Sequence, residues 1–285
     1  FLKTMGILKT GELASKKTQR LIDKKKTDVI KLLKERWRED EINKQLGSMP
    51  QRYLVYVPAP NIVAHINLFR NLNDKDFIWQ ILKEDDSDMS SVSICGRDKP
   101  GFYSKIAGVF FLNGLDIVAS QAYSLGEEHV LDIFKVTPPK DRLFDKEKWK
   151  KTEDDLIHAI SDDHFLDNAL NKIHKTIQVS SGKIPRPNSI RIDNKTSSFF
   201  TIVEVFTYDF QGLLFSITNA LYRGNTNVNV AMVATKVDQV VDIFYIRSLE
   251  NDAKIETRQE LEQIKNAILN SLPKITAKEI TNEKN

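Results

Sequence analysis

Residues 98–118 read DKPGFYSKIAGVFFLNGLDIV, and residues 209–230 read DFQGLLFSITNALYRGNTNVNV. Each stretch opens with Asp-x-x-Gly, continues with apolar residues at helical spacing, breaks at a turn and enters a strand-like run. The two stretches lie 111 residues apart, and an Asp-Ile-Phe triplet follows each of them at an offset of 110 residues. Two motifs, a helix and a turn in the same order and spacing indicate an internal repeat.

The repeat predicts two modules with the element order βαββαβ, the ferredoxin-like unit. We expect these modules over residues 89–195 and 196–285, after a helical connector over residues 1–88. In the first module, strands are expected at 92–95, 115–124, 130–136 and 189–193, with a second helix over 154–175; the second module should close on an edge strand at 274–278. The predicted fold class is therefore α+β.

The connector shows helical periodicity. Ile22, Val29, Leu33 and Trp37 recur at steps of seven and four, which predicts one long helix over residues 15–46. Glycine and proline then interrupt the pattern, and a shorter helix is expected to follow. This part of the chain is typical of a connector rather than of a ligand site.

The composition is that of a folded chain, with 285 residues of which 41% are hydrophobic and 28% charged. No run approaches the roughly 20 apolar residues of a membrane helix, and lysines interrupt the first apolar residues. We therefore expect neither a membrane anchor nor a signal peptide. The single cysteine, Cys95, excludes an internal disulfide and a CxxC metal site, which favours a reducing, cytoplasmic setting.

The net charge of +3 is unevenly distributed, because the first forty residues hold twelve Lys or Arg and six Asp or Glu. A basic end can contact nucleic acid or a membrane surface. Here acidic residues alternate with the lysines, which favours a solvated helix face. We therefore expect no nucleic-acid partner.

The two Asp-x-x-Gly turns have the chemistry to hold a small zwitterion. Glycine permits a positive φ and a close approach of the backbone to a ligand. The helix that follows offers unpaired N–H groups suited to a carboxylate, and the aspartate can accept hydrogen bonds from an ammonium group. The same turn also serves as a purely steric corner between a strand and a helix, and the local sequence leaves both interpretations open.

The duplicated turn resembles the tandem ACT domains, a family of amino-acid-sensing regulatory modules. The chain is most similar to the ACT pair of the PII-protein uridylyltransferase/uridylyl-removing family of nitrogen regulation. Two further stretches support the resemblance: MPQRYLVYVPAPNIVAHINLFRNL at 49–72 and RIDNKTSSFFTIVEVF at 191–206. The resemblance covers nearly the whole chain and is most specific over residues 50–272.

The resemblance implies a glutamine sensor that switches a parent enzyme between attaching UMP to the PII protein and removing it. It places the ligand between the turn after the first strand of a module and the start of the second strand. The positions implied are Asp98, Pro100, Gly101 and Phe102 facing Asp116 in the first module, and Asp209, Gln211, Gly212 and Leu213 facing Asn227 in the second.

Two of these positions depart from the family pattern. Gln211 replaces the usual proline of the turn, and Asp116 stands where an asparagine is common. An aspartate only accepts hydrogen bonds, whereas an asparagine also donates them. This difference favours the second module as the ligand site.

No catalytic motif is recognisable in the chain. Gly47-Ser48 is 26 residues from Asp74, too far for a nucleotidyltransferase signature, and the five histidines show no metal-ligand spacing. We expect no catalytic residues, no metal site and no cofactor here, and Mg²⁺ only in catalytic domains that this chain lacks. Because the sequence begins at Phe1, we interpret it as a piece of a longer enzyme.

The leading hypothesis is therefore a regulatory glutamine-binding region of a uridylyltransferase, whose partners are the PII protein, the missing catalytic domains and a second copy in a homodimer. The first alternative is a tandem ACT sensor of another amino acid, either alone or in another enzyme. The second alternative is an interaction module that docks the PII protein or nucleic acid without binding a small ligand.

Overall fold

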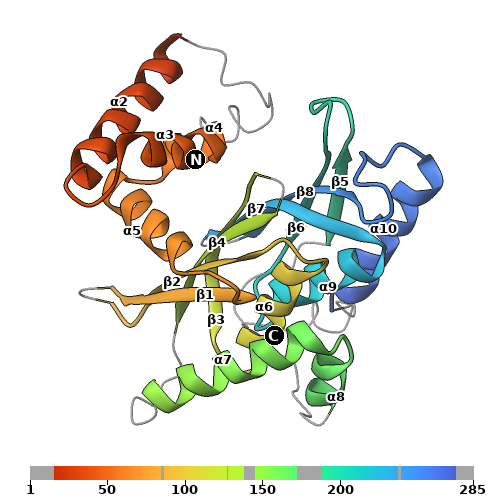
Figure 1. Cartoon of the computed structure of the whole chain (residues 1–285). Helices are drawn as coiled ribbons and strands as arrows, with labels where there is room; N and C mark the ends of the chain where they lie inside the picture. The colour runs from red at the N-terminus through yellow and green to blue at the C-terminus, as the bar shows by residue number, and fades with distance from the viewer. Residues whose placement is uncertain are drawn as a thin grey trace, which may run out of the picture.

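The computed structural model describes residues 16–84, 87–126, 128–137, 145–171, 188–236 and 239–273. It begins with a group of four helices, which Figure 1 shows apart from the other helices of the chain. These are α2 (Lys16–Leu33), α3 (Glu39–Ser48), α4 (Gln51–Tyr56) and α5 (Ala59–Arg70). Their apolar side chains, including Ile22, Val29 and Leu33, form one buried cluster, as the periodicity predicts.

The prediction of one continuous helix over residues 15–46 is wrong. Helix α2 ends at Leu33, and the chain then turns. Helix α3 begins after Arg38, whose backbone is extended. Three acidic residues fill the first turn of α3, where negative charge is stabilised by the helix dipole. The indole of Trp37 donates a hydrogen bond to Asn67 of α5, which holds the turn against the helix group.

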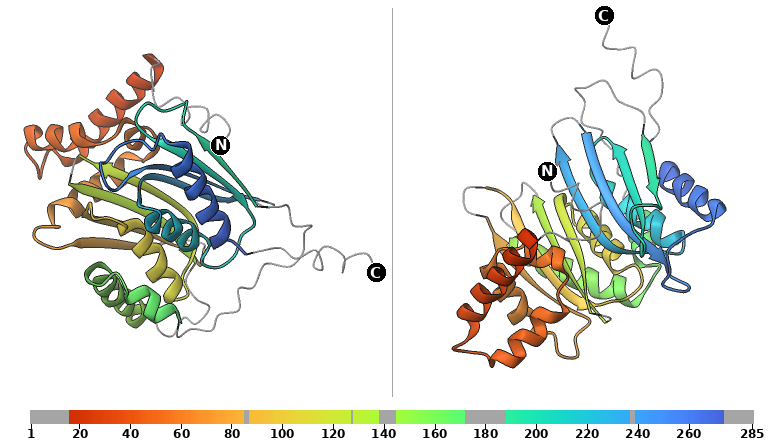
Figure 2. Two further views of the ribbon diagram at one scale, coloured as in Figure 1. Left: turned by 90° about the vertical axis from the view of Figure 1, so that its right-hand side faces the viewer. Right: turned by 90° about the horizontal axis from the view of Figure 1, so that it is seen from above.

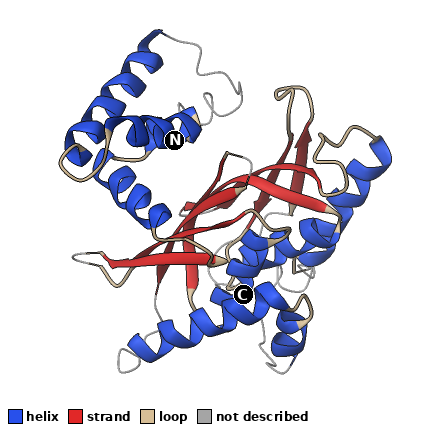
Figure 3. Ribbon diagram, in the orientation of Figure 1, coloured by secondary structure: helices blue, strands red, loops and turns tan. Residues whose placement is uncertain are grey.

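Within the described residues that follow α5, the strands form one antiparallel sheet of eight strands in the order β1-β2-β4-β3-β7-β8-β6-β5. Figure 3 shows these strands in red, with helices in blue on either side of the sheet. The first half contains β1 (Phe77–Lys83), β2 (Ser90–Arg97), β3 (Asp116–Leu125) and β4 (His129–Thr137); the second half contains β5 (Ser189–Asp193), β6 (Thr201–Thr207), β7 (Thr226–Lys236) and β8 (Gln239–Ser248). This architecture confirms the predicted α+β fold class with a helical N-terminal part.

The two halves meet where β3 pairs with β7. The described register sets Ala119 opposite Ala234 and Gln121 opposite Met232. Each of these strands also carries a β-bulge, between Ile117 and Ala119 in β3 and between Val228 and Val230 in β7. The bulges recur at the same 111-residue offset as the turns, so the repeat extends to irregularities of the backbone.

Residues 189–193 do form a strand, but the prediction that this strand closes the first module is wrong. The strand, β5, pairs with β6 of the second half, from Ser189 opposite Phe206 to Asp193 opposite Ile202. The corresponding edge of the first half is β1, which pairs with β2 and precedes it. Each half therefore takes its edge strand from the chain ahead of it. The predicted strand at 274–278 lies outside the described residues.

The described helices that pack on one face of the sheet are α6 (Phe102–Leu112), α7 (Asp145–Ser161), α8 (Phe165–Asn171), α9 (Leu213–Arg223) and α10 (Arg258–Ser271). Helices α2–α5 pack on the opposite face of the first half, where their cluster includes Cys95 and Leu131. Figure 2 shows the first half of the sheet between these two helix layers. None of the described helices is long and apolar enough to cross a membrane.

The module boundaries at residues 88/89 and 195/196 stay a prediction. Each of them separates two strands that pair with one another, β1 from β2 and β5 from β6. The strand pairing therefore favours boundaries that lie ahead of β1 and ahead of β5.

Candidate functional site

Each Asp-x-x-Gly turn ends in a glycine with a left-handed backbone, directly before a helix. The φ angle is 72° at Gly101 before α6 and 88° at Gly212 before α9. A Cβ atom at Gly101 would lie 2.8 Å from the ring of Tyr222, and one at Gly212 would lie 2.8 Å from the ring of Phe111. Each turn is therefore packed beneath an aromatic ring on the helix of the other half.

The predicted facing pairs are wrong, because the structure exchanges them between the two halves. The side chain of Asp98 is hydrogen-bonded to that of Asn227, not placed against Asp116. Asp116 instead lines a cavity with Asp209 and Gly212. The antiparallel pairing of β3 with β7 is the cause, since it brings the start of each of these strands beside the turn of the other half.

We call the cavity at the first turn pocket A. Its lining includes Asp98, Lys99, Phe102, Tyr103, Asp132 and residues 227–229. We call the cavity at the second turn pocket B, and its lining includes Phe111, Asp116, Asp209, Gly212, Leu213 and Asp242. Both are small, about 10 Å³ in pocket A and about 20 Å³ in pocket B. A single water needs roughly 10–15 Å³, so an amino acid enters either pocket only if its walls move apart.

Seven of the ten predicted site residues line one of these pockets. Asp98, Phe102 and Asn227 line pocket A, whereas Asp116, Asp209, Gly212 and Leu213 line pocket B. Gly101 forms the turn beside pocket A. Pro100 and Gln211 are exposed and line neither pocket.

Each pocket has carboxyl groups in its lining, and the surrounding protein shifts the pKa of several of them. Burial raises the pKa of Asp98, and the hydrogen bond with Asn227 partly offsets that rise. Asp116 is exposed at the start of β3, and partial desolvation of its carboxyl raises its pKa, which a backbone hydrogen bond from Ile117 partly offsets. In pocket A, Lys99 forms an ion pair with Asp76 at 2.6 Å.

The sequence-based prediction missed one buried aspartate in each pocket. Asp132 is 2% exposed and Asp242 is fully buried, and both are the first residue of an Asp-Ile-Phe triplet. Burial raises the pKa of Asp132 well above its usual value, and the nearby charge of Asp98 raises it further. The available signal was an aspartate flanked on both sides by apolar residues within a strand, a position where a charge is rarely buried unless it is paired or functional.

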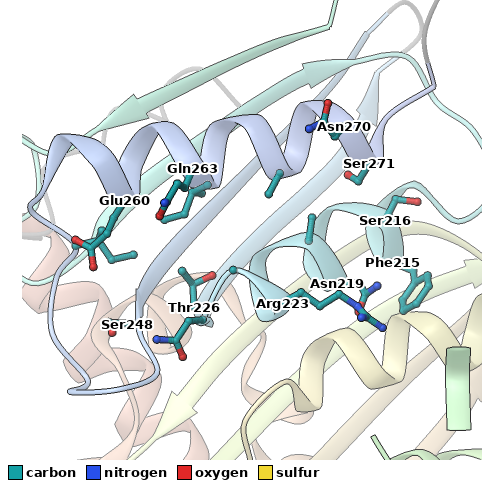
Figure 4. Close-up of a pocket in the computed structure, with 16 residues that line it drawn as sticks. Phe215, Ser216, Asn219, Arg223, Thr226, Ser248, Glu260, Gln263, Asn270 and Ser271 are labelled. Carbon is teal, nitrogen blue, oxygen red and sulfur yellow. The ribbon is translucent and has the colours of Figure 1, made fainter. Parts of the chain in front are cut away.

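A larger cavity than either pocket lies elsewhere, between α9 and α10, and measures about 710 Å³. Figure 4 shows Asn219 and Arg223 on α9 opposite Gln263 on α10. None of the ten predicted residues lines this cavity. No group of three or more His, Cys, Asp or Glu side chains within the described residues is arranged to hold a metal ion.

Comparison with known proteins identifies relatives of one kind, although no family model matches the chain. A bifunctional uridylyltransferase/uridylyl-removing enzyme from Rhodospirillum rubrum is 27% identical over 225 residues, which are 77% of this chain and 24% of that enzyme. The enzyme of the same name from Bradyrhizobium sp. ORS 278 is 27% identical over 83% of this chain and 26% of its own length.

A further relative of the same name, from Novosphingobium aromaticivorans, is 23% identical over 94% of this chain and 29% of its own length. The chain thus spans about a quarter of the curated relatives that it matches. Over most of its length, the chain is related to one region of bifunctional uridylyltransferase/uridylyl-removing enzymes.

Proposed function

We propose that the chain is the regulatory region of a uridylyltransferase/uridylyl-removing enzyme, built from a tandem pair of ACT modules, and that it senses glutamine. The parent enzyme modifies the PII protein in the cytoplasm. Its nucleotidyltransferase and hydrolase centres, and the Mg²⁺ that they use, belong to domains that this chain lacks. The kinship with such enzymes over one region of about a quarter of their length supports this role.

The observation that carries the proposal is that each Asp-x-x-Gly turn lies against a strand of the other half. Pocket A joins the turn at Asp98 to β7, and pocket B joins the turn at Asp209 to β3. Each pocket therefore has one wall from each half of the sheet. A ligand that separates the walls changes how the halves pack, and this difference in packing is the coupling free energy that allosteric control requires.

The test is calorimetric titration of this chain with L-glutamine, with glutamate, asparagine and serine as controls. We expect saturable binding of glutamine that is at least tenfold tighter than binding of the controls. Equal binding of all four amino acids would contradict the glutamine assignment and support a sensor for a different amino acid.

Variants with matched changes locate the ligand. Asp98→Ala removes a carboxylate from pocket A, and Asp209→Ala removes the corresponding one from pocket B. If glutamine binds, at least one of these variants should weaken the binding by roughly tenfold, as expected for loss of a hydrogen bond to a charged group. Unchanged binding in both variants would place the ligand outside the two pockets.

The second candidate function is an interaction module without a small ligand, which the small volumes of both pockets favour. Such a module would dock the PII protein, the catalytic domains or a second copy of itself. Failure of all four amino acids to bind would support it, and sedimentation analysis of the chain alone and with PII would then identify the partner.

A further inference from the structure

Two buried oxygen atoms that line pocket A have no hydrogen-bond partner within the described residues. They are Oδ2 of Asp132 and Oδ1 of Asn229. Asp132 lies on β4, and Asn229 is the extra residue of the bulge in β7, so the two oxygens come from different halves of the sheet. Leaving a buried acceptor without a donor destabilises the fold, and such atoms in native proteins call for an explanation.

The other polar groups around pocket A are already engaged with partners. The hydroxyl of Tyr103 and that of Ser120 form a hydrogen bond of 2.5 Å with each other, and the side chain of Asp98 is bonded to Asn227. The ammonium of Lys99 forms its ion pair with Asp76. Pocket A therefore holds acceptor oxygens in excess of donors, which disfavours a carboxylate and favours a group that carries several N–H bonds.

Building on the function proposed above, we propose that pocket A recognises a nitrogen group of its ligand, with the side chains of Asp132 and Asn229 accepting its N–H hydrogen bonds. The group is a primary amide or an ammonium, because both supply at least two N–H donors. A ligand held in this way contacts both halves of the sheet. Recognition of the amide would also distinguish glutamine from glutamate, whereas both amino acids carry the ammonium.

Pocket B keeps the buried aspartate, Asp242, but differs from pocket A at the other equivalent positions. Val118 occupies the bulge of β3 that corresponds to Asn229, and Leu214 corresponds to Tyr103. Asp116 corresponds to Asn227 and adds a carboxyl to the lining. The asparagine expected in a ligand pocket thus belongs to pocket A, so the preference inferred from Asp116 shifts to the first turn.

The experiment is calorimetric titration with L-glutamine of the wild-type chain and two variants, Asp132→Asn and Asn229→Val. Valine occupies the corresponding bulge of β3, so the backbone of the repeat accommodates it. Thr226→Val serves as the control, because it removes a buried hydroxyl from the same strand outside pocket A. Circular dichroism and thermal unfolding report whether each variant is folded.

We expect each pocket A variant to bind glutamine at least tenfold more weakly than wild type, and the control to stay within twofold. If the wild-type chain binds glutamine and both variants bind it equally well, this inference is wrong while the proposed function stands. If the wild-type chain binds none of the four amino acids, both are wrong. Should Asp132→Asn fail to fold, Asn229→Val decides alone.

Two analogues identify the nitrogen group. N-ethylated glutamine lacks one amide N–H but keeps the ammonium, whereas glutaramic acid keeps the amide and lacks the ammonium. If the amide is the group recognised, the difference between wild type and Asn229→Val should shrink for the ethylated analogue and persist for glutaramic acid. The opposite pattern would assign the ammonium, and a full difference with both analogues would contradict direct recognition of either group.

Discussion

Pockets A and B occupy corresponding backbone positions and differ in their side chains. Both combine a glycine turn, the start of a central strand and a buried aspartate. Pocket A adds Asn227 and Asn229, where the other half carries Asp116 and Val118. The comparison teaches that the repeat keeps the backbone frame of the two pockets, whereas a few polar side chains within that frame differ.

The two halves also differ on the face of the sheet opposite α6 and α9. In the first half, helices α2–α5 cover this face, and Tyr53, His65 and Tyr123 lie in the contact. In the second half, a separate small cluster centres on Ile202, Ile243 and Tyr245. Contacts with the helix group can therefore affect the stability of the two halves unequally.

The largest expected effect tests whether the two turns are equivalent. Gly101→Ala and Gly212→Ala should each lower the free energy of unfolding by about 2–5 kcal/mol, because the left-handed backbone costs about 1–2 and overpacking about 1–3 kcal/mol. Urea unfolding monitored by circular dichroism measures both variants. Similar losses are expected, because each added Cβ would meet an aromatic ring at 2.8 Å.

Two other glycines separate the two contributions. Gly126 has a φ of 68° but no atom within 4 Å of its added Cβ, so Gly126→Ala should show the backbone cost alone, about 1–2 kcal/mol. Gly47 lies in α3 with open space around it, so Gly47→Ala should stabilise the chain by about 0.5–1 kcal/mol. If Gly101→Ala lowers the free energy of unfolding no more than Gly126→Ala does, the ring of Tyr222 moves aside without a measurable cost.

The next effect concerns the helix group that covers the first half. His65 is buried between the hydroxyls of Tyr53, at 2.8 Å, and Ser93, at 2.9 Å. Burial lowers the pKa of His65 to about 4. The unfolded chain therefore takes up a proton near pH 6.5 while the folded chain does not, and stability that is present above this pH is lost as the pH falls towards 4.

The expected loss between pH 7 and pH 4 is about 3 kcal/mol, measured by urea unfolding at each pH. His65→Gln removes the titrating group and is the control that subtracts all other ionisations. A pH dependence that is the same in wild type and in His65→Gln would show that the imidazole titrates normally in the folded chain.

A smaller effect is expected at Asp132, with the opposite sign of pH dependence. Burial raises the pKa of this carboxyl, so its contribution to stability is fully present below the unfolded pKa of about 4 and is lost as the pH rises through the folded value. Asp132→Asn should therefore be more stable than wild type at pH 7, by about 1–2 kcal/mol, and the gain should vanish near pH 4.

Thermal unfolding of wild type and Asp132→Asn at several pH values measures this gain. Combined with the expected loss of glutamine binding, a gain in stability would mark Asp132 as a residue kept for function at the expense of stability. Lower stability of the variant at pH 7 would instead assign the carboxylate a structural role.

The repeat in the sequence predicted most of the elements within each half but not how the two halves pair with each other. The 111-residue offset located both turns, both helices and the hairpins, because local spacing and glycine chemistry determine them. It could not show that the Asp98 turn faces Asn227, since that depends on which strands of the two halves pair. Likewise, Asp132 was visible only as part of a repeated triplet, because the missing partner of its Oδ2 is a feature of the three-dimensional structure.

The smallest expected effect concerns the contact of the helix group with the second half. The guanidinium of Arg52 in α4 lies 4.7 Å from the centre of the Tyr245 ring in β8. Removing this cation–π contact by Arg52→Ala should lower the free energy of unfolding by about 0.5–1 kcal/mol, measured in urea. Because Tyr245 belongs to the second half, the contact joins the helix cover of one half to the sheet of the other.

Arg52→Lys is the matched variant, because it keeps the positive charge and changes the shape of the group that lies over the ring. We expect it to retain part of the stability that alanine loses. Equal losses for lysine and alanine would assign the effect to the planar stacking of the guanidinium on the ring rather than to charge. If neither variant lowers the free energy of unfolding, the contact with Tyr245 contributes no stability. The helix group would then stabilise the first half of the sheet alone.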